Sequence, residues 1–203
     1  MAESVIQVNS GSGPKIHTWN RTIGANSVED QFLLPGEYPV ASYILLFPSV
    51  SLATANDHIA AWEAGTTNVV RVRRIHIEQS ANASTAAATS ISLLRTTTAG
   101  SGGTAVTPSK HDTADGAYSG LARYLGTKGT ESTELTRAAM VWRQAVAVAQ
   151  AQFDDVWEWV QLPGQKPFII PAGTANGMCL KSTSAVAGAT VHITVELLET
   201  SFL

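Results

Sequence analysis

The feature that most constrains the fold is a period of two in hydrophobicity, repeatedly interrupted by turn-forming residues. It is clearest near the C-terminus, where every second residue from Val191 to Leu197 is apolar and the residues between them are polar. Because successive side chains of a β-strand point to opposite faces, this alternation predicts a strand with one buried and one solvated face. Comparable segments recur at 43–50, 69–78, 90–96, 156–162, 168–170 and 178–181. Turns rich in Gly and Pro, such as 99–103 and 163–164, separate them.

This pattern predicts a mainly β protein, an antiparallel β-sandwich or jelly roll with at most one helix. No internal repeat of 20–50 residues is visible in the sequence, which argues against propellers and solenoids. We expect the sandwich to span 41–203. We expect an irregular N-terminal arm over 1–40, with one short strand at 5–8, because Gly and Pro residues at 11–14 and 35–39 break any regular period.

Three segments allow two interpretations each. The apolar phase of 69–78 slips at Arg73-Arg74, which indicates either a β-bulge or two separate strands. Residues 58–63 suit a strand or a short helix, and we favour a strand. Between 133 and 152, the many alanines favour a helix whereas the alternating valines favour a strand, and the sequence leaves this choice open.

Composition narrows the functional classes. The 203 residues carry a net charge of −3, and only 14% are charged, against about 25% in an ordinary soluble domain. We therefore expect neither a nucleic-acid partner nor a membrane partner, since the chain has no basic excess and its longest apolar stretch is 43–47. No signal peptide is recognisable, which predicts synthesis in a cytoplasm. Cys179 is the only cysteine, which excludes an intrachain disulfide.

A surface poor in charge costs little to desolvate and suits wide protein–protein contacts. The alternative is a weakly charged β protein rich in small residues. Between these two interpretations we favour the contact surface.

The search for chemistry yields one compact cluster, His111, Asp112 and Asp115, in a turn-rich region. Two carboxylates with nearby carbonyls could bind a hard cation such as Ca²⁺, or could cap turns by accepting backbone N–H bonds. We favour turn capping, and we keep a cation-dependent hydrolase only as a minor hypothesis. The histidines lack the close pairwise spacing of metal ligands on one element. We predict no catalytic site, no bound metal and no cofactor.

Four aromatic residues are candidates for contacts with a partner protein. Trp157 and Trp159 share one face if 156–162 is a strand, where they could pack in the core, form a subunit contact or stack on sugar rings. Trp19 and Phe32 are apolar anchors in the arm, which could lie across its own domain or a neighbouring one.

Several short motifs resemble structural proteins of tailed bacteriophages. They include His58-Ile59-Ala60-Ala61-Trp62, the Val-Arg-Ile strand over 69–75, the arginine-bearing strand 93–97 and the Gly-Gly-Thr-x-x-Thr-Pro loop over 102–108. The Trp-Glu-Trp of 157–159 and the Ile-Pro-Ala-Gly turn of 170–173 follow the same pattern. The resemblance covers roughly 55–200 and excludes the arm.

The resemblance implies a non-enzymatic virion component, made in the cytoplasm of a bacterial host. Its most specific form is a head decoration or cement protein, a β-sandwich that binds the major capsid protein and copies of itself as a trimer or another symmetric oligomer. A receptor- or glycan-binding module of a tail, baseplate or fibre is the alternative. The residues leave open the position in the head, neck or tail and the oligomer order.

Overall fold

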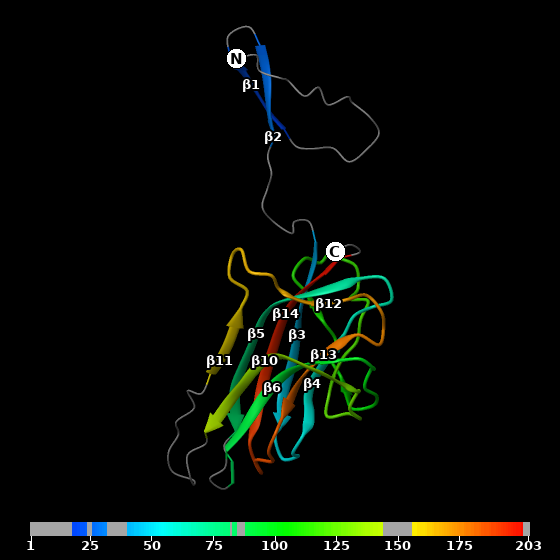
Figure 1. The fold of residues 1–203 in the computed structure, drawn as a ribbon, viewed down its shortest axis with the longest axis vertical. Coiled ribbons are helices and arrows are strands. Elements are labelled where there is room, and N and C mark those ends of the chain that lie inside the picture. Colours follow the sequence, from blue (N-terminus) through cyan, green and yellow to red (C-terminus); the bar gives the residue numbers. More distant parts are fainter. Residues whose placement is uncertain are drawn as a thin grey trace. The chain divides into compact units, whose positions relative to one another are not determined.

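A computed structural model describes residues 18–23, 26–31, 40–81, 83–84, 88–143 and 156–200. Within these ranges all of the regular secondary structure is β-strand, which confirms the predicted mainly β fold (Figure 1). The chain divides into two compact units, Met1–Tyr38 and Pro39–Leu203. In the described ranges no helix is long and apolar enough to cross a membrane.

The described residues of the second unit form eight main strands in two antiparallel sheets. In chain order they are β3 (Ala41–Ser51), β4 (Asp57–Glu63), β5 (Val69–Ala81), β6 (Ala88–Thr96), β10 (Glu131–Arg143), β11 (Val156–Val160), β13 (Gly177–Ser182) and β14 (Thr190–Thr200). One sheet has the order β11-β5-β14-β3 and the other β10-β6-β13-β4. Numbered one to eight along the chain, these main strands have the order 6-3-8-1 in the first sheet and 5-4-7-2 in the second. This is the strand order of a jelly roll.

Four short strands extend the two sheets. The connection from β6 to β10 contributes β7 (Thr104–Ala105), β8 (Ser109–Lys110) and β9 (Ala122–Tyr124), and β12 (Phe168–Ile170) pairs with β5. The Tyr118 hydroxyl donates to the Glu63 carbonyl at 2.6 Å. Asp115 accepts a bond from the Ser42 amide at 3.0 Å. These contacts fasten the connection to strands of both sheets.

The core lies between the sheets and takes side chains from both. Val191, Ile193, Val195 and Leu197 of β14 are at most 1% exposed, as their alternation predicts. The largest fully buried side chains include Trp62 of β4, Phe47 of β3 and Ile75 and Ile77 of β5. Burying one such side chain contributes about 1.5–3 kcal/mol, so these alternating positions stabilise the sandwich.

The phase slip in β5 is a β-bulge within one continuous strand. Arg74 pairs with Glu196 and Val72 with Leu197 of β14, which leaves Arg73 as the extra residue. The bulge returns the apolar positions to the core face, so that Val70 and Val72 on one side of it and Ile75 and Ile77 on the other are all buried. The two-strand alternative is therefore wrong.

The other two ambiguous segments are also strands where they are described. Residues 58–63 lie in β4, as favoured, and 133–143 lie in β10, which pairs antiparallel with β6. The register of β10 shifts three times between Glu131 and Met140, and this irregularity is consistent with the mixed sequence signal. Residues 144–152, the rest of the Ala-rich segment, lie outside the described residues.

The first unit contains a hairpin that sequence reasoning missed. Strands β1 (Thr18–Ile23) and β2 (Asn26–Gln31) pair antiparallel in a continuous register from Thr18–Gln31 to Ile23–Asn26. The strand expected at 5–8 lies outside the described residues. The stretch predicted to be irregular therefore carries regular structure over at least 18–23 and 26–31.

Candidate functional site

The first candidate surface is the edge of one sheet, formed by β11. Among the strands that the structure describes, this one is last in the order of its sheet, and it pairs with β5 from Val156–Glu78 to Val160–Arg74. The Gln161 amide continues the ladder by donating to the Arg73 carbonyl at 2.8 Å. The bulge at Arg73 therefore lies where β11 ends.

The two tryptophans of β11 face the core of their own chain. Trp159 is 7% exposed, and its ring lies 4.4 Å from that of Phe168, centre to centre, at an angle of 33°. Trp157 is partly buried against the same core. The structure therefore places both rings where they pack within one chain, which is the first of the three roles that the sequence allowed.

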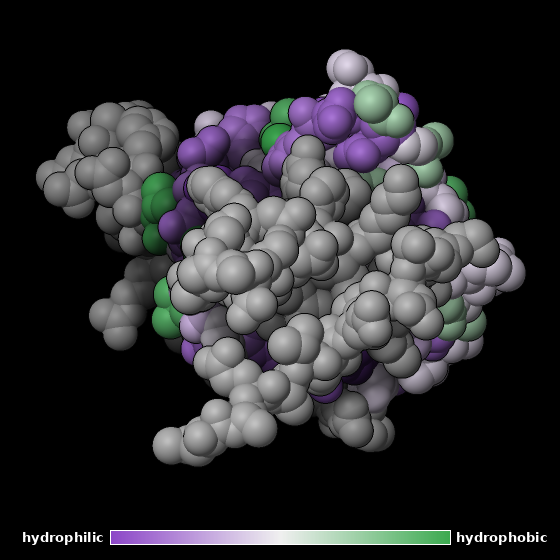
Figure 2. Space-filling model, turned by 90° about the horizontal axis from the view of Figure 1, so that it is seen from above, coloured by the Kyte–Doolittle hydropathy of each residue, from purple (hydrophilic) through white to green (hydrophobic). Residues whose placement is uncertain are grey.

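The residues that alternate with the tryptophans form the outward face of the strand. Val156 is 53% exposed and Val160 44%, and Leu162 beyond the strand is 57% exposed. We call Val156, Glu158, Val160 and Leu162 the edge strip. Sequence reasoning overlooked it, although the signal was present: once Trp157 and Trp159 are inward, alternation turns Val156, Glu158 and Val160 outward. The face of the molecule seen in Figure 2 shows no such strip among the described residues: its hydrophobic residues form separate spots beside hydrophilic surface.

A charged ladder crosses the sheet next to the edge strip. Arg74 donates to Glu158 at 2.7 Å through Nε and to Glu196 at 2.8 Å through Nη1. These bonds raise the pKa of Arg74, and the bond from Arg74 lowers the pKa of Glu158. Glu158 is still 41% exposed, so its ionised carboxylate is accessible to a second cation. The strip is thus apolar at both ends and acidic in the middle.

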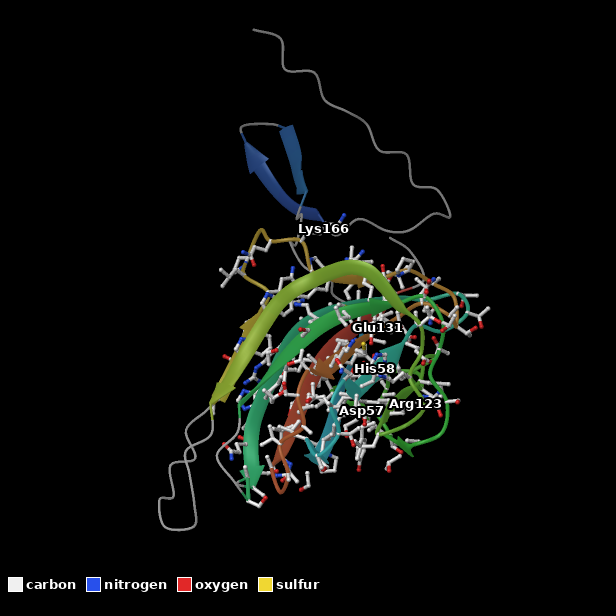
Figure 3. The ribbon with its side chains drawn as sticks, turned by 60° about the horizontal axis from the view of Figure 1, so that its bottom comes forward. Asp57, His58, Arg123, Glu131 and Lys166 are labelled. Atoms are coloured by element: carbon white, nitrogen blue, oxygen red, sulfur yellow. The ribbon has the colours of Figure 1, made fainter. Side chains whose placement is uncertain are left out.

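A second candidate site is a polar cluster on the other sheet. The His58 Nε2 atom lies 3.1 Å from Glu131 Oε1, and Lys181 Nζ donates to Glu131 Oε2 at 2.8 Å. Figure 3 shows His58 and Glu131 close together. Burial lowers the pKa of His58, although the bond to Glu131 opposes it. Burial by itself raises the pKa of Glu131. The hydrogen bonds to Lys181 and His58 lower it by more, so the net shift of this pKa is downward. The cluster joins β4, β10 and β13.

A pocket lies beside this cluster, with His58 in its wall. Its volume is about 300 Å³, which includes the solvent space at its open mouth. Glu63 in its wall is 3% exposed, accepts the Gly100 amide at 3.1 Å and lies 3.7 Å from Arg123 Nη2. Burial raises the pKa of Glu63, against the opposing charge of Arg123. The bond to Gly100 fixes the start of the connection between β6 and β10, which gives Glu63 a structural role.

Cys179 lies on the same sheet. Its thiol is buried, and burial raises its pKa to about 12. A thiol with such a pKa is protonated at neutral pH and is a poor nucleophile.

The acidic cluster of the sequence forms a turn. Asp112 accepts the Ala114 amide at 2.9 Å through Oδ1, and its carbonyl accepts the Asp115 amide at 3.0 Å. Asp115 binds the Ser42 amide, and the His111 amide donates to the Ser42 carbonyl. These bonds match the favoured interpretation of turn capping. Nowhere in the described ranges do three or more side chains of His, Cys, Asp or Glu gather as a metal site would require.

The candidates in the arm are only partly described. Trp19 lies on β1, opposite Asp30 of β2. Phe32 lies outside the described residues.

No family model, no curated protein and no solved structure matches the chain.

Proposed function

We propose that this chain is a non-enzymatic structural component of a tailed-phage virion, a head decoration or cement protein that binds the capsid and copies of itself. The observation that carries the proposal is the jelly-roll strand order, since viral capsid and lectin domains use this architecture. The fold alone does not determine a function. The phage-like motifs over roughly 55–200 give this fold its viral interpretation.

The edge strip supplies a surface suited to repeated contacts. Its three apolar side chains are about half exposed, and covering the exposed half of each contributes about 1 kcal/mol per side chain. One such contact is weak. In a particle with many copies, the contacts act together, and avidity exceeds the affinity of any single contact.

The alternative of a glycan-binding module finds less support in the structure. It relied on Trp157 and Trp159 as a platform for sugar rings, and both rings face the core. We therefore develop the virion proposal alone.

The proposal is tested by binding to capsids that lack the protein. Particles are prepared from the encoding phage after deletion of this gene, mixed with the purified chain and sedimented. We expect the wild-type chain to sediment with the particles in a saturable manner. A chain that stays in the supernatant at every concentration would overturn the proposal.

Two variants test the role of the edge strip in that assay. Val160→Asp places a charge in the strip, and Leu46→Asp places one at a similarly exposed position, 52%, on β3. We expect Val160→Asp to weaken co-sedimentation at least tenfold and Leu46→Asp to change it by less than threefold. Equal effects would show that capsid binding does not use the strip.

A further inference from the structure

The backbone of β11 presents hydrogen-bonding groups at the edge of its sheet. The Gln161 amide bonds to the Arg73 carbonyl, and in an antiparallel ladder the residues that bond to one neighbour alternate along the strand. The two tryptophans of β11 therefore bond to β5, while the amides and carbonyls of Val156, Glu158 and Val160 point away from it. Among the described strands, β5 is the one that pairs with β11 (Figure 1). The groups that point away can therefore bond to an added strand.

The side chains of the same three residues restrict which strand can be added. Val156 is 53% exposed, Val160 44% and Glu158 41%. Residues opposite each other in an antiparallel pair share a face of the sheet, so each of these side chains meets one side chain of the added strand. Two apolar residues match the valines, and a Lys or Arg between them matches Glu158.

The Glu158 carboxylate can bind such a cation beside the one that it already holds. Arg74 reaches it through Nε at 2.7 Å and through Nη2 at 2.6 Å, and both nitrogens contact Oε1. A basic side chain on the added strand therefore binds through Oε2. Glu158 would then lie between two cations, as Arg74 already lies between Glu158 and Glu196.

A second copy of β11 does not fit this edge. The antiparallel register that uses every outward amide and carbonyl of both copies is symmetric about Glu158, so it sets the two Glu158 carboxylates opposite each other. Like charges directly opposite destabilise a ladder. The next register, symmetric about Trp159, needs the Leu162 carbonyl, which already accepts the Gln165 amide at 3.0 Å. The edge therefore favours a strand of opposite charge over its own copy.

We propose that β11 accepts an extended segment of the capsid protein, which adds to the sheet as an antiparallel strand and carries Lys or Arg between two apolar residues at every second position. The basic residue lies opposite Glu158, and the apolar residues lie opposite Val156 and Val160. The antiparallel direction matches the described pairings of this sheet. The inference rests on the proposed function, in which the edge strip contacts the capsid.

An NMR titration of the isotopically labelled full chain tests the contact. The probe is the peptide Thr-Val-Thr-Arg-Thr-Val-Thr with both ends blocked, whose pattern is the same in both directions. We expect saturable shifts of the amide signals of Val156, Glu158 and Val160, with a dissociation constant of about 1 mM or below. Unchanged signals at these residues, at peptide concentrations well above that value, would overturn the contact.

Methylation of the peptide backbone tests the pairing of main chains. In the proposed register the nitrogens of Arg and of both Val donate to β11, whereas those of the Thr residues between them point away. Methylation of the Arg nitrogen should weaken binding at least tenfold, and methylation of a neighbouring Thr nitrogen less than threefold. Equal effects would overturn strand addition.

Substitution of the carboxylate tests the charge match. A peptide with Glu in place of Arg should bind the wild-type chain at least tenfold more weakly, and Glu158→Gln should remove this preference. The matched control is Glu78→Gln on β5, which removes the same charge from a carboxylate that is 47% exposed and should keep the preference within threefold. A preference that persists in Glu158→Gln would overturn the match.

Capsid sedimentation with the same chain separates this inference from the proposed function. A chain that sediments with capsids but does not bind the Arg peptide would reject the contact and leave the proposed function intact. A chain that binds the Arg peptide but not capsids would overturn the capsid protein as the partner.

Discussion

Replacement of Trp159 by Ala tests whether the tryptophans of β11 belong to the core. Trp159 is 7% exposed, and the centre of its ring lies 4.4 Å from that of Phe168. Removal of a buried Trp costs about 3–5 kcal/mol, and the edge position of β11 places this site near the lower end, at about 3 kcal/mol. For a chain of this size, that loss lowers Tm by about 6–12 °C.

The assay is urea unfolding followed by circular dichroism, with free energies obtained by linear extrapolation. Val160→Ala, one residue away but 44% exposed, is the matched control and should change stability by less than about 0.5 kcal/mol. Combining Trp159→Ala with Phe168→Ala in a double-mutant cycle should give a coupling of about 0.5–1.5 kcal/mol. An unfolding free energy for Trp159→Ala equal to that of the wild type would refute the core assignment and return the ring to a subunit contact.

Three further predictions concern His58, Cys179 and Gly120. Burial lowers the pKa of His58, so the unfolded chain binds more protons below about pH 6.5 and stability falls there; His58→Gln should flatten this loss in urea titrations at pH 7 and 5. Cys179 should react with a thiol reagent at pH 8 only after unfolding, and a fast reaction of the native chain would contradict its burial. A Cβ at Gly120 would lie 1.9 Å from the Glu63 carbonyl, so Gly120→Ala should cost about 1–3 kcal/mol, whereas Gly116→Ala, with open space, should be near neutral in the same measurement.

The sandwich could be predicted from the sequence because its signals are local. Alternation in β14 and the phase slip in β5 are each visible within ten residues or so, and both result from burial of one face of a strand. The hairpin β1–β2 was missed because neither strand shows strong alternation of apolar and polar residues: β2 has a single apolar residue, Val28.

The sites could be predicted only in part, since they depend on contacts across long separations. The bond between His58 and Glu131 joins residues 73 positions apart, and that between Arg74 and Glu158 joins residues 84 apart. A single sequence contains no signal for such pairs. The outward face of β11, in contrast, follows from local alternation: Val156, Glu158 and Val160 alternate with Trp157 and Trp159 and so point to the opposite face.

The most direct test of the virion proposal is the amount of this chain in purified particles of the encoding phage. Quantitative mass spectrometry would compare it with the major capsid protein after density-gradient purification. The proposal predicts a fixed ratio of the two proteins across gradient fractions, which identifies a regular component of the shell. Absence from the particles, or an amount that varies from fraction to fraction, would contradict it.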